Sequence, residues 1–308
     1  MNLDFSGVMR RAWDITWRNK GLWILGILSA IGAGGGGRFN SNVRLPNGGT
    51  GDPSQQFRNL FPNLDQNTAL AIGLGVACVA LIIVLVFYVL SVIGRGGLIG
   101  GIQLADSKGS ARLGEAWAIG VKNFVTVLLI GLVVAVIGVV IAIASVFAAA
   151  TVCLLPLACL GFIIVAALNV FTYLAQIAAV TERLSVGEAF NKAWQMVKAN
   201  IGAVAVLGII LAVIQGIVGF VVALPLGLIL VPLFAGVVGF ASENRTAGGA
   251  AFAIAGLCFV AWLPVLIIVR GIVETWVTSA WTLAYRQLST QTGSAPAAAP
   301  LAPPPMAR

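Results

Sequence analysis

The sequence contains no histidine, and this absence removes a large part of ordinary enzyme chemistry. Histidine is the commonest general base and metal ligand, and its charge changes near neutral pH. A Ser-His-Asp triad, a Cys-His pair and a histidine-bound metal are therefore excluded from this chain. The ten acidic residues are scattered rather than clustered. We expect a protein that is not an enzyme and that holds no cofactor or metal.

Charge is also scarce. Only 9% of the 308 residues are charged, whereas a soluble domain carries roughly 25%. Hydrophobic residues make up 59% of the chain, and its mean hydropathy is +1.02. Too few charges are present to cover a water-soluble surface, so the bilayer must be part of the solvent. The composition predicts an all-α, polytopic bundle of transmembrane helices in the inner (plasma) membrane of a cell.

Cysteine is rare, and each cysteine lies within or beside an apolar run. The four are Cys78, Cys153, Cys159 and Cys258. No CxxC spacing of a metal or redox site occurs. Cys153 and Cys159 flank Pro156 near a predicted outer turn, where a disulfide is an alternative. We expect small buried apolar side chains instead.

Six apolar runs predict about six spans. They lie near residues 21–35, 68–93, 124–150, 157–180, 201–222 and 250–277. The first is short, since a spanning helix needs about 17–25 residues. A cleaved signal peptide over residues 1–33 is the alternative there. The charged segment before the run is long for that role and contains Asp4 and Asp14, so we expect a retained helix.

The remaining segments set the domain limits. Residues 36–67 are rich in glycine, asparagine and proline and predict an outer loop. Residues 224–240 are apolar but interrupted by prolines and glycines. They are interpreted as a kinked extension of the fifth helix or a partly inserted piece, with a seventh span as the alternative. The transmembrane domain is expected over residues 1–289, followed by a disordered Ala/Pro-rich tail over residues 290–308.

The net charge of +8 is distributed unevenly across the six-span arrangement. One side holds Arg10, Arg11, Arg18, Lys20, Arg95, Lys108, Arg112, Lys122, Arg183, Lys192, Lys198, Arg286 and Arg308. The other side holds Arg38, Arg44, Arg58 and Arg245. The positive-inside rule therefore predicts that both termini are cytoplasmic. Anionic lipid headgroups on the cytoplasmic side are the expected partners, rather than nucleic acid.

Amphipathic segments precede several of the spans. Residues 3–18 place apolar and aromatic side chains on one helical face and charged ones on another. Tryptophans cluster where the inner interface is expected, and this is typical of an aromatic belt. The expected interfacial anchors are Trp13, Trp17, Trp117 and Trp194.

An internal repeat is visible. Leu3–Gly21 aligns without a gap on Leu184–Gly202, with identities at leucine, alanine, tryptophan, asparagine and glycine positions. Ser185 and Glu188 form a capping-box pattern in the second copy. Its Gly-Glu-Ala recurs at Gly114, where a shorter middle copy begins. We expect three units, each an interfacial amphipathic helix followed by a two-span hairpin.

The segment Gly-Glu-Ala-Phe-Asn-Lys-Ala-Trp-Gln-Met-Val-Lys, which begins at Gly187, resembles an uncharacterised bacterial family of integral membrane proteins. That family is related to the membrane domain of glycerophosphoryl diester phosphodiesterases. The resemblance covers most of the chain in pattern, and it brings no catalytic residues. It implies membrane or lipid-associated work, and it gives no basis for assigning an enzymatic activity.

Three charged residues near apolar spans are candidates for a functional site. Arg270 and Glu274 are four residues apart, so they share a face of one helix. Within the bilayer they would form an inward-facing pair; near the cytoplasmic end, Arg270 would reach the interface and Glu274 would offset it. Arg95 is interpreted as an anchor at the inner boundary, with phosphate capture as the alternative.

Two functions compete on these observations. A non-enzymatic scaffold, assembly or lipid-interacting protein fits the interfacial helices and the missing chemistry. A transporter or channel for a small solute, using Arg270 and Glu274, fits the repeat and the interrupted segment. Few polar residues line the spans, which favours the first function.

Overall fold

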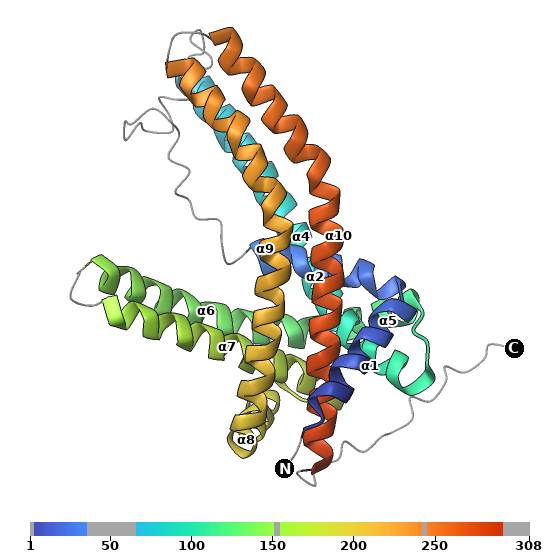
Figure 1. Cartoon of the computed structure of the whole chain (residues 1–308). Coiled ribbons are helices and arrows are strands. Elements are labelled where there is room, and N and C mark those ends of the chain that lie inside the picture. Colours follow the sequence, from blue (N-terminus) through green and yellow to red (C-terminus); the bar gives the residue numbers. More distant parts are fainter. Residues whose placement is uncertain (1–2, 36–65, 151–154, 242–244, 292–308) are drawn as a thin grey trace, which may run out of the picture. The chain divides into compact units, whose positions relative to one another are not determined.

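The computed structural model describes residues 3–35, 66–150, 155–241 and 245–291, and every regular element in these ranges is an α-helix. This confirms the all-α prediction. The helices are α1 Phe5–Arg18, α2 Gly21–Gly35, α4 Gln66–Lys108, α5 Leu113–Lys122, α6 Phe124–Ala150, α7 Leu155–Glu182, α8 Val186–Ala199, α9 Ile201–Ala241 and α10 Arg245–Gln291 (Figure 1).

The chain divides into two compact units. Unit 1 comprises residues 1–29, 92–220 and 268–308, and unit 2 comprises residues 30–91 and 221–267. The long helices α4, α9 and α10 each contribute residues to both. All the charged and aromatic groups of the candidate site belong to unit 1.

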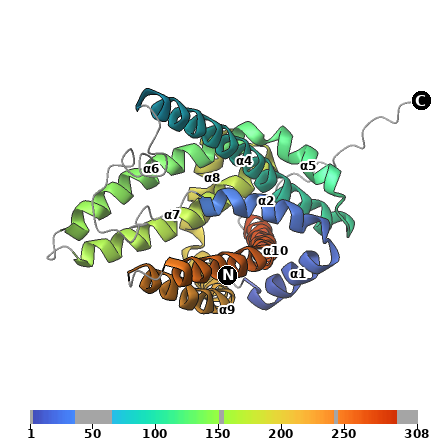
Figure 2. The same cartoon turned by 90° about the horizontal axis from the view of Figure 1, so that it is seen from above.

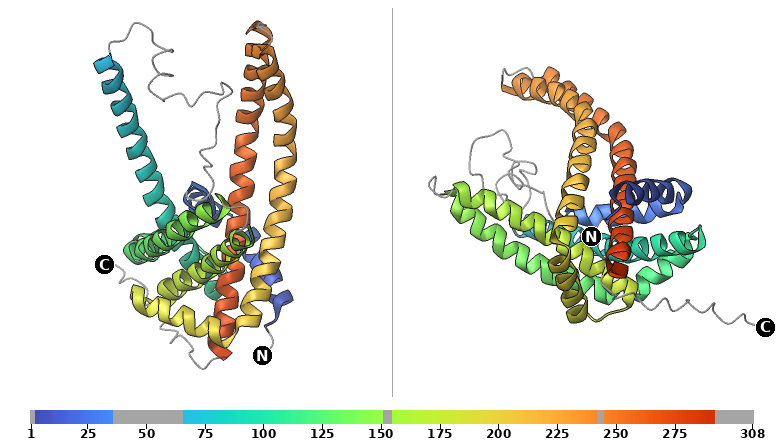
Figure 3. Two further views of the ribbon diagram at one scale, coloured as in Figure 1. Left: turned by 90° about the vertical axis from the view of Figure 1, so that its left-hand side faces the viewer. Right: turned by 60° about the horizontal axis from the view of Figure 1, so that its bottom comes forward.

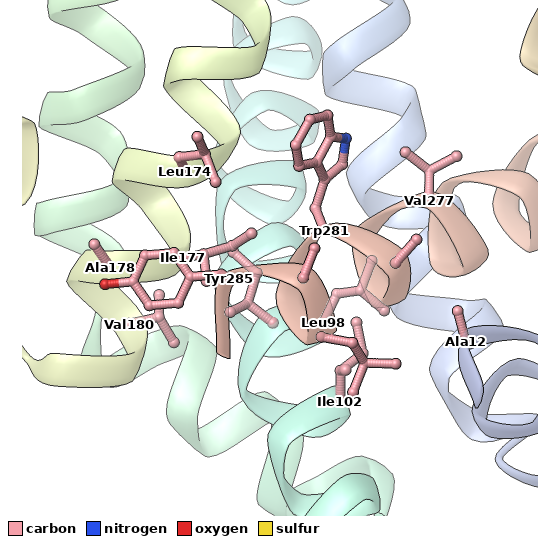
Figure 4. Packing of buried hydrophobic residues seen from close by; sticks show 14 of the residues in the cluster. Ala12, Leu98, Ile102, Leu174, Ile177, Ala178, Val180, Val277, Trp281 and Tyr285 are labelled. Carbon is pink, nitrogen blue, oxygen red and sulfur yellow. The ribbon is translucent and has the colours of Figure 1, made fainter. Parts of the chain in front are cut away.

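The core of unit 1 forms where α7 and α10 meet α4. Figure 4 shows Tyr285 of α10 beside Ala178 and Val180 of α7, with Leu98 of α4 nearby. The side chains of Tyr285, Ala178 and Leu98 are almost completely buried. Helices α6 and α7 run side by side in the same unit (Figures 1 and 2). Because these side chains come from helices far apart in sequence, unit 1 is held together by long-range packing.

Helix α4 continues well beyond residue 93, where the sequence pattern predicted its end. The continuation contains glycines on the faces that contact α2 and α5. A Cβ on Gly94 would lie 2.8 Å from Leu28 Cβ, and one on Gly97 would lie 2.9 Å from Ala116 O. The glycines therefore permit close helix contacts rather than breaking the helix.

Residues 224–240 form no separate helix. They belong to α9, which runs unbroken through Pro225 and Pro232. In unit 2 this part of α9 lies beside α10 (Figures 1 and 3). Trp262 Nε1 donates to Val222 O at 3.4 Å, and a Cβ on Gly236 would lie 2.8 Å from the Phe252 ring. The interpretation as an extension of the fifth helix is confirmed.

Five helical segments are long and apolar enough to cross a membrane. They are Ala71–Lys108, Phe124–Ala144, Ile164–Glu182, Ile201–Gly236 and Gly248–Thr290. The first predicted span, near residues 21–35, contains a shorter apolar helix, Gly21–Ile31. Large apolar side chains such as Leu81 and Leu228 are exposed, as expected where lipid is the solvent. The chain thus has the character of a multi-pass membrane protein.

Several sequence predictions have a different outcome. The expectation of buried cysteines is wrong for Cys78 and Cys258, which are free and exposed on apolar helices. An apolar side chain on a lipid-facing helix need not be buried in protein, which explains the difference. The Cys153–Cys159 alternative lies outside the described side chains. The predicted loop 36–67 and tail 290–308 lie almost entirely outside the described residues.

Candidate functional site

Glu274 of α10 lies at the centre of a polar group inside unit 1. Its side chain is only 8% exposed, and its Oε1 is 3.5 Å from Nη2 of Arg95 on α4. The hydroxyl of Tyr173 on α7 donates to the same oxygen at 3.0 Å. Three helices distant in sequence therefore place one charged or polar side chain each at this point.

Arg95 makes two further contacts. Its Nε donates to Ser29 Oγ of α2 at 3.4 Å, and its guanidinium carbon lies 5.2 Å from the centre of the Tyr173 ring. We name Arg95, Tyr173, Glu274 and Ser29 the Arg95 cluster. A buried ion pair contributes little net stability when intact, but removal of one partner leaves an uncompensated charge and is strongly destabilising. The cluster therefore fixes how α2, α4, α7 and α10 pack.

Arg270 does not join this cluster. Its side chain is exposed and makes no ion pair with the residues that the structure describes. Gly271 and Thr275 lie on the buried face of α10, and a Cβ on Gly271 would collide with Ile27. At about 100° per residue, Glu274 lies at the margin of that face and Arg270 lies farther out. The cation that pairs with Glu274 is therefore Arg95, whereas the sequence favoured Arg270.

Ion pairs also hold the C-terminal ends of α4 and α7. Asp106 Oδ1 forms an ion pair with Nη2 of Arg11 on α1 at 2.7 Å, and Asp106 Oδ2 accepts from Arg286 of α10. Glu182 lies 3.7 Å from Lys192 of α8. Its carboxylate also accepts from the hydroxyl of Tyr285 at 2.6 Å. Sequence reasoning missed both groups, because each one joins separate segments. The pairs attach α1 and α8 to the core of unit 1.

Helices α1, α5 and α8, which we call the three short helices, end in the same way. Each contains Ala-Trp-x-x-x-x-x-Asn, and the asparagine is its C-cap. Each asparagine Nδ2 donates to the carbonyl four residues earlier, at 3.2, 2.9 and 3.4 Å for Asn19, Asn123 and Asn200. The alanine of each motif is fully buried. An apolar helix follows each junction.

The predicted interfacial tryptophans are not equally exposed. Trp13 and Trp194 are 54% and 52% exposed, and Trp17 is also exposed, whereas Trp117 is half-buried. Trp13 and Trp17 contact each other with ring centres 5.4 Å apart. Lys198 lies over the Trp194 ring at 4.8 Å. Such basic, aromatic surfaces are typical of helices at the headgroup level of a membrane.

The described residues include no group of three or more histidine, cysteine, aspartate or glutamate side chains placed to hold a metal ion. The Arg95 cluster pairs its carboxylate with a guanidinium and a hydroxyl. Three other polar atoms of unit 1 are buried without a hydrogen-bond partner among the described residues: Gln176 Oε1, Trp276 Nε1 and Asp106 Oδ1, the last of which lies in the ion pair with Arg11. Buried polar atoms of this kind call for an explanation, such as a water or a ligand.

Five helices long and apolar enough to cross a membrane give the chain the character of a multi-pass membrane protein. A family match spans residues 17–285, so the chain belongs to the family of unknown function DUF7544. No curated protein and no solved structure matches it. The resemblance to the membrane domain of glycerophosphoryl diester phosphodiesterases stays a prediction.

Proposed function

We propose that this chain is a non-enzymatic protein of the inner membrane that acts by binding lipid headgroups on the cytoplasmic side, as a scaffold or assembly factor. The carrying observation is that α1 and α8 expose tryptophan beside basic residues immediately before apolar helices. An exposed tryptophan is unfavourable in water, but its ring is stabilised at the level of the headgroups.

Helix α1 has the surface that this function needs. The ring of Trp17 contacts both Trp13 and Trp23, with the second pair of ring centres 5.2 Å apart. Trp23 Nε1 donates to Thr16 O at 2.8 Å. The aromatic group is thereby fixed across the joint between α1 and α2. Arg18, in the last turn, is available to lipid phosphate.

Helix α8 repeats the arrangement with different contacts. The Trp194 ring packs at right angles against Phe171 of α7, with ring centres 6.4 Å apart, and Lys198 lies over it. The shared Ala-Trp and asparagine positions of α1, α5 and α8 support an organisation in three units. In this proposal α2 is a short sixth span, and all three short helices lie at the cytoplasmic surface.

Lipid retention tests the proposal. The full chain is purified in mild detergent, and bound phospholipid is counted by native mass spectrometry. We expect bound phospholipid on the wild-type protein and a several-fold loss in the double variant Trp13→Ala/Trp17→Ala. The control is Leu228→Ala. Leu228 is exposed on α9, and no lysine or arginine lies near it in the sequence. An absence of bound phospholipid, or equal loss in the control, would contradict the proposal.

A solute path through unit 1 is a second candidate. It is favoured by the partnerless Gln176 Oε1 and Trp276 Nε1 on the helices that carry Tyr173 and Glu274. Uptake of labelled amino acids and sugars into proteoliposomes would then be lost in Glu274→Gln. It would remain in Arg270→Ala, because Arg270 lies outside the cluster. Equal uptake by wild-type and empty vesicles would leave only the lipid-binding function.

A further inference from the structure

A small cavity lies between α1 and the C-terminal end of α4. Its volume is about 160 Å³, well above the roughly 10–15 Å³ that is needed to hold one water. Arg11, Asp14, Arg18 and Asn19 line it from α1, and Asp106 lines it from α4. The cavity has room for a small polar headgroup, and an acyl chain would remain outside.

The two carboxylates that line the cavity, Asp106 and Asp14, are not paired equally firmly. Asp106, only 7% exposed, is already bound by Arg11 and by Arg286. Arg18 and Asp14 are paired loosely, with their atoms 3.7 Å apart and both side chains well exposed. An exposed pair of this type is worth about 0–1 kcal/mol. Arg18 and Asp14 can therefore give up their contact with each other and bind a ligand instead, with little loss of free energy.

The position of the cavity restricts its ligand. Arg11, Asp14 and Arg18 recur at helical spacing, so the single carboxylate of Asp14 lies between two guanidinium groups along one face of α1. The Trp13 and Trp17 rings are exposed on the same helix. If α1 lies in the headgroup layer, as the proposed function requires, the cavity opens at the depth of lipid phosphates.

We propose that this cavity binds the headgroup of a phospholipid with a primary ammonium, of the phosphoethanolamine type. The phosphate is held by Arg18 and Arg11, and the ammonium donates to Asp14. This inference rests on the proposed lipid-binding function and names its ligand class. The trimethylammonium group of phosphatidylcholine has no N–H to donate to Asp14. The glycerol headgroup of phosphatidylglycerol is uncharged, so it brings no ammonium to lie between Asp14 and the lipid phosphate.

Competition among lipids tests the assignment. The full chain is delipidated in detergent and exposed to an equimolar mixture of phosphatidylethanolamine, phosphatidylcholine and phosphatidylglycerol with identical acyl chains. Native mass spectrometry then counts each bound lipid. We expect the wild-type protein to prefer phosphatidylethanolamine by up to about fivefold, the ratio that one exposed ion pair of ~1 kcal/mol provides.

Three variants separate the contributions. Asp14→Asn is expected to bind phosphatidylethanolamine and phosphatidylcholine equally, and Arg18→Gln to weaken binding of all three lipids. Glu115→Gln removes an exposed carboxylate from the interfacial helix α5 and should keep the wild-type preference. Asp14 and Arg18 are exposed, so both variants should fold, and their unchanged melting temperatures would confirm this.

The outcomes distinguish the two levels of the proposal. Bound lipid without a preference in the wild-type protein, or a preference that survives in Asp14→Asn, would overturn the headgroup assignment and leave the lipid-binding function in place. A preference for phosphatidylglycerol would do the same. An absence of all three lipids from both the wild-type protein and Glu115→Gln would overturn the proposed function itself.

Discussion

Asn19 and Asn200 end their helices with the same hydrogen bond. Asn19 Nδ2 donates to Ile15 O at 3.2 Å, and Asn200 Nδ2 donates to Met196 O at 3.4 Å. Both residues are buried, and in each case an apolar helix begins within two residues. The side chain adds a second donor to a carbonyl that also accepts from the backbone N–H of the same asparagine, at 3.1 Å in both helices. The bond therefore helps to fix the joint between each short helix and the apolar helix after it.

Asn200→Ala should weaken this joint. The substitution removes the buried side-chain donor to Met196 O and leaves only the backbone N–H of residue 200, which costs about 1 kcal/mol. The measurement is the free energy of unfolding by denaturant in detergent micelles. Asn191→Ala is the control, because Asn191 is exposed on the same helix and its side-chain oxygen accepts only from Gln195. Equal stability of the two variants would contradict the role given to Asn200.

Arg95→Ala should destabilise the protein by about 3 kcal/mol, because it leaves the buried Glu274 without its cation. Tyr173→Phe removes one hydrogen bond from the same carboxylate and should cost about 1 kcal/mol. Arg270→Ala should change stability by less than about 0.5 kcal/mol, as an exposed substitution does. Thermal unfolding in micelles measures all three, and a larger loss in Arg270→Ala than in Arg95→Ala would restore the pairing expected from the sequence.

Gly120→Ala should disrupt the contact between α5 and α4. A Cβ at this position would collide with Ile93 O and lie 2.8 Å from Gly97 N, and neither backbone atom can move aside easily. Overpacking of this kind costs about 1–3 kcal/mol. Gly114→Ala is the matched control on the same helix, because its Cβ would meet nothing within 4 Å. Unfolding midpoints that agree for both variants would show that α4 and α5 do not pack so closely.

The capping box of α8 should depend on pH. The backbone N–H of Ser185 and then its hydroxyl donate to the Glu188 carboxylate, and they hold the pKa of Glu188 below its usual 4.5. Because the pKa is lower in the folded state, this contribution is complete above about pH 4.5 and is lost as the pH falls through the lowered pKa.

Glu188→Gln is therefore expected to lower the melting temperature at pH about 7, and the difference from wild type should shrink at pH about 3. Glu115→Gln is the control, because Arg112, the N-cap of α5, makes no side-chain capping hydrogen bond. A difference that stays constant across this range would show that the carboxylate charge has no part in the capping of α8.

Local signals predicted much of the helix architecture. The caps of α1 and α8 were predictable because Asp4 and the pair Ser185 and Glu188 act within one helical turn. The predicted capping box of Ser185 and Glu188 is confirmed, and Asp4 Oδ1 accepts from Gly7 N at the start of α1. The Arg95 cluster was not predictable, because its members are far apart in sequence. Spacing along α10 favoured Arg270 as the partner of Glu274, and only the packing of α4 and α7 against α10 shows Arg95 and Tyr173 there.

The middle short helix illustrates a different limit. Alignment of α5 and α8 at their Gly-Glu-Ala starts hides the match between their ends, because α5 is shorter than α8. Alignment at the asparagines Asn123 and Asn200 reveals the shared Ala-Trp. This match was present in the sequence, but the role of the asparagine as the C-cap became evident only from the structure.

The central claim is that α1, α5 and α8 all lie at the cytoplasmic surface of the membrane. Cysteine accessibility from the two sides of a sealed membrane tests it most directly. The native cysteines are replaced, and single cysteines are introduced at Ser6, Ala118 and Gln195, which are exposed on α1, α5 and α8. A membrane-impermeant thiol reagent is then added to vesicles of either orientation. Our account has α2 as a sixth span, so all three positions should react only from the cytoplasmic side. Reaction of Ser6→Cys from the side opposite to Ala118→Cys and Gln195→Cys would contradict it.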